Sequence, residues 1–330
     1  MGSTSPREIR NVAVAGVSAS HASISIPWRS RWLTVQLQAT GSVGSNVLSG
    51  LLELNRFNVT VLTRKEGATF PAGVTAKVAD FSSVESLTGI LEGQDALIDT
   101  TASMEIQTPI NLINAAAAAG VYRYITSDFG LDPLNMKVAS LPVFARKAAS
   151  FQAAKRAHGK TGMTYTVVAT GAFLDWNLRN RFSGIDLFDK KIQFFDDGTH
   201  VLPWTTLESV GKATAAVLAH AAEMENRVVY ISSLVKSQKD IVEAAKQALG
   251  ADGWQSAVVD MDAMFQQAME RFKAGDYGRQ TMGPMIQYAT AKDDYSGPWE
   301  KDDNALLGVK SMSDDELKDL IKELVAAGGK

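Results

Sequence analysis

Short apolar runs alternate with helix-length segments over the first half of the chain. Residues 11–16 read NVAVAG, a run that ends in glycine and is too short for a helix. Similar runs predict strands at 57–62, 74–79, 96–100, 121–126 and 164–169, and the stretches between them predict helices at 43–54, 84–91, 106–119 and 143–158. This alternation predicts an α/β fold built on a doubly wound parallel sheet.

The second half of the chain is less regular. Residues 191–195 and 200–204 predict a hairpin around Asp197-Gly198, and residues 228–231 predict a strand. Helices are expected at 207–222, 237–249, 261–273 and 313–326, the last opening with the capping-box pattern Ser313-x-x-Glu316. Residues 291–310 predict a loop. These elements predict a smaller α/β lobe.

Composition and charge exclude several classes of protein. The 330 residues carry a net charge of −3, which gives no electrostatic footprint for nucleic acid or an anionic membrane. There is no cysteine, so disulfides, thiolate nucleophiles and cysteine-ligated metals are excluded. The four histidines are scattered, and we predict no metal site. No apolar stretch reaches the roughly 18 residues of a membrane span, and residues 1–10 lack an apolar signal core. We expect a soluble, cytoplasmic protein.

A glycine-rich turn follows the first strand, but it is interrupted. Joining Gly16 directly to Ala39 gives Gly16-Ala39-Thr40-Gly41-Ser42-Val43-Gly44, a G-x-x-G-x-x-G fingerprint between a strand and a helix. As the chain stands, the 22 residues 17–38 lie between. Connections from strand to helix in such folds usually have about 2–6 residues, so this segment conflicts with the motif.

Three explanations of the segment stay open. A retained intron fits, because the codons could begin with GT at Val17 and end with CAG at Gln38, and 22 whole codons keep the frame. A genuine insertion also fits. In the third, residues 33–37 form the first strand and lead into Ala39, with Gln38 in place of the first glycine.

The turn and the end of the second strand predict a dinucleotide cofactor. Backbone N–H groups and the dipole at a helix N-terminus bind pyrophosphate, and glycine permits the close approach. We expect contacts from Gly16, Thr40, Gly41, Ser42, Val43 and Gly44, while a simple tight turn is the alternative. An acidic residue after the second strand would favour NAD, but Arg64 and Lys65 stand there and suit the 2′-phosphate of NADPH/NADP+. A solvated loop pair is the alternative.

Further candidates follow the later strands of the sheet, at the edge where such folds bind ligands. The small residues Thr101 and Ala102 would run beneath the cofactor, and Phe129 follows the fifth strand. Lys147 opens a helix and would hold the nicotinamide ribose and assist proton transfer, unless it is a solvated lysine. Gly171 and Phe173 would border the substrate.

Two other patterns carry less weight. The pair Tyr-x-x-x-Lys occurs at Tyr288 and Lys292, far from the expected site, and we interpret it as chance. An aromatic-rich region after the sixth strand fits either a pocket wall or the core of the second lobe. It consists of Trp176, Phe182, Phe188, Phe194, Phe195 and Trp204.

Together these motifs resemble the NmrA-like and isoflavone-reductase-like family of atypical short-chain dehydrogenases, in particular its fungal branch. The matching positions are Gly16, 39–44, Arg64, 127–130, Phe144-x-x-Lys147, Asp197-Gly198 and 208–210. The resemblance implies a Rossmann-type domain with a small substrate lobe, Arg64 on the 2′-phosphate and Lys147 as the active-site lysine. In the plant enzymes NADPH delivers hydride to a phenolic or benzylic substrate. The interruption after Gly16 departs from the pattern.

These expectations lead to competing hypotheses about function. The first is an NADPH-dependent reductase of a small, apolar or aromatic carbonyl or phenolic-type substrate, with Lys147 assisting. The second is a non-catalytic NADP(H)-sensing regulator of a partner protein. A third is that the interrupted chain is non-functional. We predict an NAD(P)-binding domain at 1–170, and a substrate lobe with the C-terminal helix, interleaved with the sheet, at 171–330.

Overall fold

The structure is a computed structural model that describes residues 7–17, 42–102 and 105–328. The chain forms two compact units, neither of which is one continuous segment. The first comprises Met1–Asp128, Arg146–Val168 and Glu208–Val229, and the second comprises Phe129–Ala145, Ala169–Leu207 and Tyr230–Lys330. Residues 129–145 thus join the second unit, and residues 208–229 return to the first.

A seven-stranded sheet forms the centre of the first unit, with the order β11-β6-β5-β4-β1-β2-β3. The strands are β1 (Asn11–Ala15), β2 (Asn58–Thr63), β3 (Val74–Val78), β4 (Ala96–Asp99), β5 (Arg123–Ile125), β6 (Thr164–Ala169) and β11 (Arg227–Tyr230). Neighbouring strands from β3 to β6 run parallel. This confirms the predicted doubly wound, Rossmann-type sheet.

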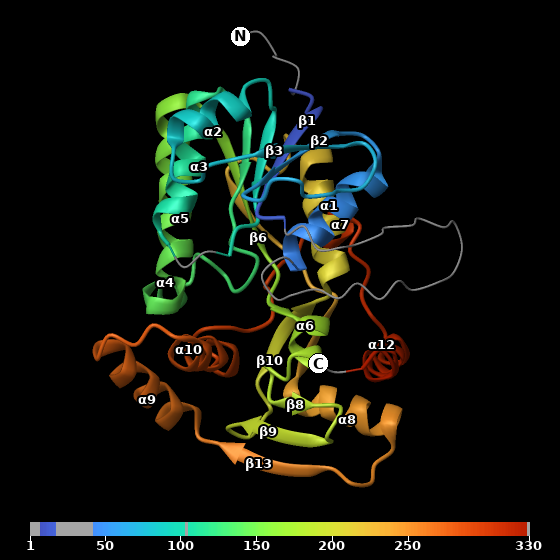
Figure 1. The fold of residues 1–330 in the computed structure, drawn as a ribbon. Coiled ribbons are helices and arrows are strands. Elements are labelled where there is room, and N and C mark those ends of the chain that lie inside the picture. The colour runs from blue at the N-terminus through green and yellow to red at the C-terminus, as the bar shows by residue number, and fades with distance from the viewer. Residues whose placement is uncertain (1–6, 18–41, 103–104, 329–330) are drawn as a thin grey trace. The chain divides into compact units, whose positions relative to one another are not determined.

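Helices cover both faces of this sheet (Figure 1). One face carries α2 (Val84–Leu91), α3 (Gln107–Ala118) and α5 (Ala145–Thr161), and the other carries α1 (Ser42–Leu54) and α7 (Leu207–Ala219). Because both faces are covered, β1, β4 and β6 are buried along almost their whole length. The continuous apolar runs in the sequence are the consequence of that burial.

The second unit contains two small three-stranded sheets. One has the order β12-β10-β7, and the other has the order β13-β9-β8. Their strands are β7 (Ala172–Phe173), β8 (Ile185–Asp186), β9 (Lys191–Phe195), β10 (Val201–Thr205), β12 (Leu234–Ser237) and β13 (Gln255–Val259). Its α-helices are α4 (Met136–Ser140), α6 (Leu174–Arg179), α8 (Gln238–Leu249), α9 (Met261–Lys273), α10 (Arg279–Ala291), α11 (Asn304–Leu307) and α12 (Asp314–Ala326), and Pro142–Phe144 is a 3-10 turn.

The predicted hairpin of β9 and β10 is wrong. The turn at Asp197-Gly198 exists, but β9 pairs with β13 and β8, whereas β10 pairs with β12 and β7. The Gln238 side chain accepts a hydrogen bond from Phe195 N (2.9 Å) and donates one to the Gln193 carbonyl (2.8 Å). It therefore occupies backbone groups that a hairpin would pair, and the two strands separate into different sheets.

Other elements of the second unit differ from the pattern in the sequence. The sequence pattern assigns no element to residues 279–290, where the structure has α10 with Pro284 inside the helix. It also predicts no strand at β13, where four of five residues are exposed and apolar periodicity is absent. The capping box at Ser313 and Glu316 is confirmed, since each side chain bonds the other's backbone N–H.

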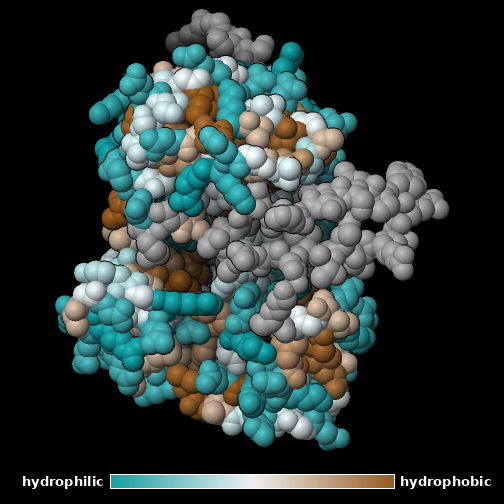
Figure 2. All heavy atoms as spheres, viewed as in Figure 1, coloured by the Kyte–Doolittle hydropathy of each residue, from teal (hydrophilic) through white to brown (hydrophobic). Residues whose placement is uncertain are grey.

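Hydrophilic residues cover most of the surface that Figure 2 shows, with hydrophobic residues in small patches among them. Large exposed apolar side chains, such as Val78, Met136 and Val258, come from different elements. In the part of the chain that the structure describes, no helix combines the length and the apolar character needed to cross a membrane.

Candidate functional site

The first unit has its topological switch point between β1 and β4, which are neighbours although two strands lie between them in the sequence. In open α/β sheets, ligands bind beyond the carboxyl ends of the strands at this point. Gly16 directly follows β1 with a φ of +89°, and a Cβ placed on it would lie 2.6 Å from the Thr100 carbonyl carbon and from Thr101 N. Only glycine fits this turn.

The first turn of α1 approaches the same backbone. Ser42, Val43 and Gly44 begin that helix, and a Cβ on Gly44 would lie 2.7 Å from Thr100 Oγ1 and 3.1 Å from the Gly16 carbonyl oxygen. Bare backbone at a strand-to-helix turn is the arrangement that admits a pyrophosphate. Thr40, Gly41 and nearly all of the segment 17–38 lie outside the described residues.

The loop after β4 is held by its own polar groups. Asp99 Oδ1 accepts hydrogen bonds from Thr101 N (2.8 Å) and Thr101 Oγ1 (2.6 Å), while Thr100 Oγ1 donates to the Ala15 carbonyl (2.6 Å). Ser127 Oγ, after β5, donates to the Thr101 carbonyl (2.8 Å). These bonds fix Thr101 beside the glycine turn and leave Ala102 exposed.

Arg64 and Lys65 directly follow β2, the strand next to β1, and both are exposed. The Thr63 hydroxyl accepts a hydrogen bond from Lys65 N (3.1 Å), which orders the start of this loop. Two cations thus lie at the carboxyl edge of the sheet, one strand away from Gly16. This placement suits a phosphate on the adenosine ribose.

Lys147 lies in the first turn of α5 and is partly buried. Its Nζ donates a hydrogen bond to the backbone carbonyl of Asp128, at the end of β5. Burial lowers the pKa of the Lys147 amine, the Asp128 carboxylate opposes this shift, and the Arg146 charge adds to it. Burial also raises the pKa of Asp128, and Lys147 counteracts that rise. The amine is therefore not a solvated surface lysine.

Three polar residues of this region were not singled out from the sequence. Tyr124 and Asp99 are fully buried, and the Tyr124 hydroxyl donates to Asp99 Oδ2 (3.1 Å). Arg146 Nη2 donates to Thr101 Oγ1 (2.5 Å) and lies 3.9 Å from Asp99 Oδ2. An acidic residue ending an otherwise apolar run, at Asp99, was the signal in the sequence. Neither Tyr124 nor Arg146 stands out in its local pattern.

The remaining predicted residues lie in the second unit. Phe129 is buried and has a φ of +32°, an unusual conformation for a residue other than glycine. Gly171 has a φ of +62°, and a Cβ on it would lie 2.0 Å from the Pro203 carbonyl oxygen, so packing within the unit requires glycine there. Phe173 ends β7 and is partly buried. Their proposed contacts with cofactor or substrate stay predictions.

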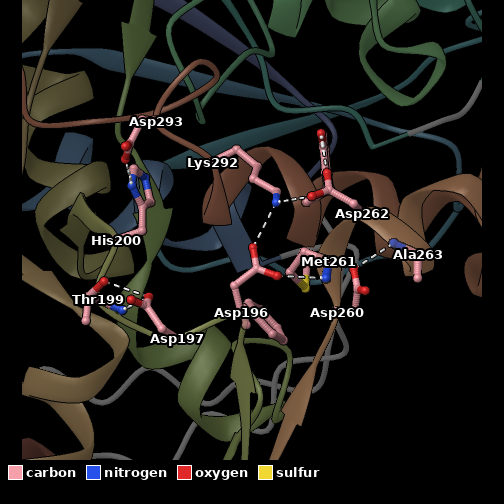
Figure 3. Close-up of polar contacts among 12 residues, drawn as sticks. Asp196, Asp197, Thr199, His200, Asp260, Met261, Asp262, Ala263, Lys292 and Asp293 are labelled. Carbon is pink, nitrogen blue, oxygen red and sulfur yellow. Dashed lines mark hydrogen bonds and ion pairs between the residues drawn. The ribbon is translucent and has the colours of Figure 1, made fainter.

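The Tyr288 and Lys292 pair is held in a separate polar cluster, and Figure 3 shows Lys292 with its partners Asp196 and Asp262. Lys292 Nζ contacts Asp262 Oδ2 (2.8 Å) and Asp196 Oδ2 (2.9 Å), and the Tyr288 hydroxyl donates to Asp262 Oδ1 (3.0 Å). Burial and the Asp262 carboxylate raise the pKa of Tyr288 to about 12. A catalytic tyrosine requires the opposite shift, toward the operating pH. The contacts therefore tie α9, α10 and the end of β9 together.

The aromatic side chains of the second unit are mainly core. Trp204 is 4% exposed and packs with Leu174, Leu202 and Ile241, and Phe194 packs against the same cluster. A cavity of about 30 Å³ lies among Phe195, Trp204 and other residues of this unit. Among the described residues, no group of three histidine or acidic side chains is arranged to hold a metal.

Curated relatives of this chain come from fungi. The oxidoreductase poxI of Penicillium oxalicum is 32% identical over 291 residues, which cover 85% of this chain and 90% of that protein. The oxidoreductase aprR of Aspergillus flavus is 29% identical over 286 residues, covering 84% of this chain and 95% of that protein.

The fold resembles those of solved reductases. The complex of leucoanthocyanidin reductase with NADPH from Vitis vinifera superposes with a TM-score of 0.72 at 16% identity, covering 96% of this chain and 99% of that one. A structure of isoflavone reductase gives a TM-score of 0.68 at 18% identity, covering 93% and 98%. Identities this low establish the shared fold alone.

A family profile matches most of the chain. The profile of the NmrA-like family matches residues 33–297. The match begins at residue 33, so β1, Gly16 and residues 17–32 of the interruption precede it. Residues 33–38, Arg64, the 127–130 turn and Lys147 lie inside it. With the sheet order, the glycine turn and the fungal relatives, this match establishes that the chain belongs to the NmrA-like family.

Proposed function

We propose that this chain is an NADPH-dependent reductase of a small organic substrate, of the apolar or aromatic carbonyl or phenolic type. The observation that carries the proposal is the Lys147 amine, held on the Asp128 carbonyl at the carboxyl edge of the sheet, with its pKa lowered. The relatives poxI and aprR are named oxidoreductases, and leucoanthocyanidin reductase was solved with NADPH, which supports the same class of reaction.

The residues at the switch point fit such a cofactor. Gly16 and Gly44 leave a cradle of backbone that a Cβ on either residue would fill. We assign the pyrophosphate to this cradle with Ser42 and Val43, and the 2′-phosphate to Arg64 and Lys65. The ordered loop of Thr101 and Ala102 would pass beneath the nicotinamide half.

The chemistry divides between cofactor and protein. Bound NADPH supplies the hydride. Lys147 would orient the nicotinamide ribose and deliver a proton to the product oxygen, directly or through water. The Asp128 carbonyl holds the amine at the strand end, and the Asp128 carboxylate favours its protonated form before transfer. Phe129, Gly171 and Phe173 would border the substrate.

Turnover and binding together test this function. NADPH oxidation is measured against aldehydes, ketones, quinones and phenolic compounds, and NADPH and NADP+ affinities are measured by fluorescence. We expect turnover on at least one class, and a Lys147→Met variant that loses about 10²-fold or more in kcat while its NADPH Kd changes little. Arg156→Met, at an exposed position of the same helix, is the matched control.

The same measurements distinguish the reductase from the non-catalytic regulator. A sensor requires no proton donor, so binding of both cofactor forms without turnover on any substrate class would favour a non-catalytic NADP(H)-sensing regulator. Full kcat in a folded Lys147→Met enzyme would remove the assigned role of Lys147. Absence of any cofactor binding would reject both hypotheses.

A further inference from the structure

Two cations occupy the first turn of α5, where the helix dipole disfavours positive charge. Arg146 and Lys147 are adjacent in sequence, and neither is a solvated side chain, since the Arg146 side chain is only 10% exposed and Lys147 is partly buried. Such a local conflict in a stable fold is typical of a functional site. It requires compensation from neighbouring groups.

The compensation comes from two strands. Arg146 points to the end of β4, where it bonds Thr101 and pairs with buried Asp99, while Lys147 points to Asp128 at the end of β5. The Ser127 hydroxyl bonds the Thr101 carbonyl and so joins the two strand ends. Arg146 and Lys147 are therefore anchored at the ends of β4 and β5, which are paired neighbours in the sheet.

Arg146 is anchored through a chain of buried polar groups. Thr101 Oγ1 accepts from Arg146 Nη2 and also donates to Asp99 Oδ1, and Tyr124 holds the other oxygen of Asp99. Among the described residues, Arg146 Nε and Asp128 Oδ2 are buried without a hydrogen-bond partner.

We propose that Arg146 is a positioning residue for Lys147, whose fixed guanidinium charge keeps the neighbouring amine ready to release its proton to the substrate. This inference rests on the proposed function for its effect on turnover, but the charge effect on the amine exists without turnover. The titratable groups that face Lys147 are Arg146 from its own helix and Asp128 from β5.

The two charged neighbours of Lys147 shift the pKa of its amine in opposite directions. Arg146 lowers the pKa of Lys147, in the same direction as burial, and Asp128 raises it. Asp99 faces Arg146, and the Tyr124 hydroxyl beside it stays protonated, because burial raises the pKa of Tyr124 well above its ordinary value. Without Arg146, the amine would keep its proton to higher pH.

The protonation of Lys147 is measured directly by competitive acetylation of the full-length chain across pH, with the Lys147 peptide quantified by mass spectrometry. Arg146→Gln is expected to move the labelling midpoint of Lys147 upward by about half a pH unit or more, since a nearby charge shifts a pKa by about one unit. Arg146→Lys retains the charge and is expected to stay near the original midpoint. Arg156→Gln, exposed on the same helix, is the control.

A folding control keeps the test decisive. Arg146→Gln leaves Asp99 buried without its cation, which destabilises a fold, so the double variant Arg146→Gln, Asp99→Asn is labelled alongside it. We expect the upward shift in both. An unchanged midpoint in either folded variant would overturn the role of Arg146. Absence of NADPH turnover would reject the proposed function, but the shift of the Lys147 labelling midpoint could still be interpreted.

Discussion

Gly44 packs against the backbone of Gly16. A Cβ added to Gly44 would lie 3.1 Å from the Gly16 carbonyl oxygen and 3.2 Å from Val17 Cα. Gly16 follows the last residue of β1 and Gly44 lies in the first turn of α1, so the strand end and the helix start meet although residues 16–41 separate β1 from α1. A connection of a few residues can join points this close.

Removal of residues 17–38 is therefore expected to leave the fold intact. The shortened chain joins Gly16 to Ala39 and restores the uninterrupted glycine fingerprint. Loop-closure entropy favours the shorter chain by about 2 kcal/mol for a roughly eightfold shorter connection. We expect a higher Tm by calorimetry and NADPH binding at least as tight as that of the full chain by fluorescence titration.

The full chain, purified in parallel, is the control for this deletion. Equal affinity in both chains would identify the segment as a tolerated insertion. A shortened chain that fails to fold would show that the segment belongs to the structure and would contradict the prediction. Transcript sequencing across the codons of Gly16 and Ala39 tests the retained-intron explanation independently.

Gly16→Ala is expected to abolish NADPH binding. Alanine at a φ of +89° costs about 1–2 kcal/mol, and its Cβ would also overlap the Thr100 and Thr101 backbone at 2.6 Å. Gly120→Ala is the matched control, because Gly120 has a φ of +73° with no atom within 4 Å of a Cβ. We expect a modest loss of Tm and unchanged affinity for the control. Similar losses in both variants would show that the close approach at Gly16 is unimportant.

The central sheet was predictable because its signal is local. Strands buried on both faces are short apolar runs, and β1, β4 and β6 lie within one residue of their predicted ends. The second unit depends on partners far away in the sequence. Whether β9 pairs with β10 is decided by Gln238, more than thirty residues later, and β13 is exposed and carries no periodic pattern.

The same distinction applies to the candidate site. Gly16 and Lys147 stand out because their spacing from a strand or a helix start has a known chemical meaning. Arg146 reads as one more basic residue of a helix, and only the folded chain brings it to Thr101 and Asp99. Buried polar networks are assembled from separate strands, so their members share no local pattern.

Arg64→Gln tests the choice between NADPH and NADH. A charge-assisted hydrogen bond to a phosphate contributes about 1.5–3 kcal/mol, so we expect the NADPH Kd to rise about ten- to a hundredfold, with the NADH Kd unchanged. Arg56→Gln, exposed just before the opposite end of β2, is the control. Parallel losses for both cofactors in Arg64→Gln would place Arg64 elsewhere than on the 2′-phosphate.

Gly211→Ala tests how α7 positions the helix of the glycine turn. A Cβ on Gly211 would lie 2.1 Å from the Asn46 carbonyl oxygen of α1, so the helices must separate. Overpacking of this kind costs about 1–3 kcal/mol, and we expect a lower Tm and weaker NADPH binding. Gly89→Ala, on α2 with open space around it, is expected to raise stability by up to about 1 kcal/mol. An unchanged Tm in Gly211→Ala would show that α1 and α7 adjust freely.

Tyr288→Phe separates a structural from a catalytic role for the Tyr-x-x-x-Lys pair. The variant loses the hydrogen bond to Asp262 at a cost of about 1 kcal/mol in unfolding free energy, and we expect NADPH turnover within twofold of the original.

The raised pKa of about 12 means that folded Tyr288 binds its proton more tightly than the unfolded chain, whose tyrosines ionise near pH 10. Its contribution to stability is thus complete below pH 10 and is lost as the pH rises through about 12. Urea unfolding at a series of pH values is expected to show a shallower loss of stability over this range in Tyr288→Phe. A tenfold fall in kcat with intact NADPH binding would instead make Tyr288 part of the reaction.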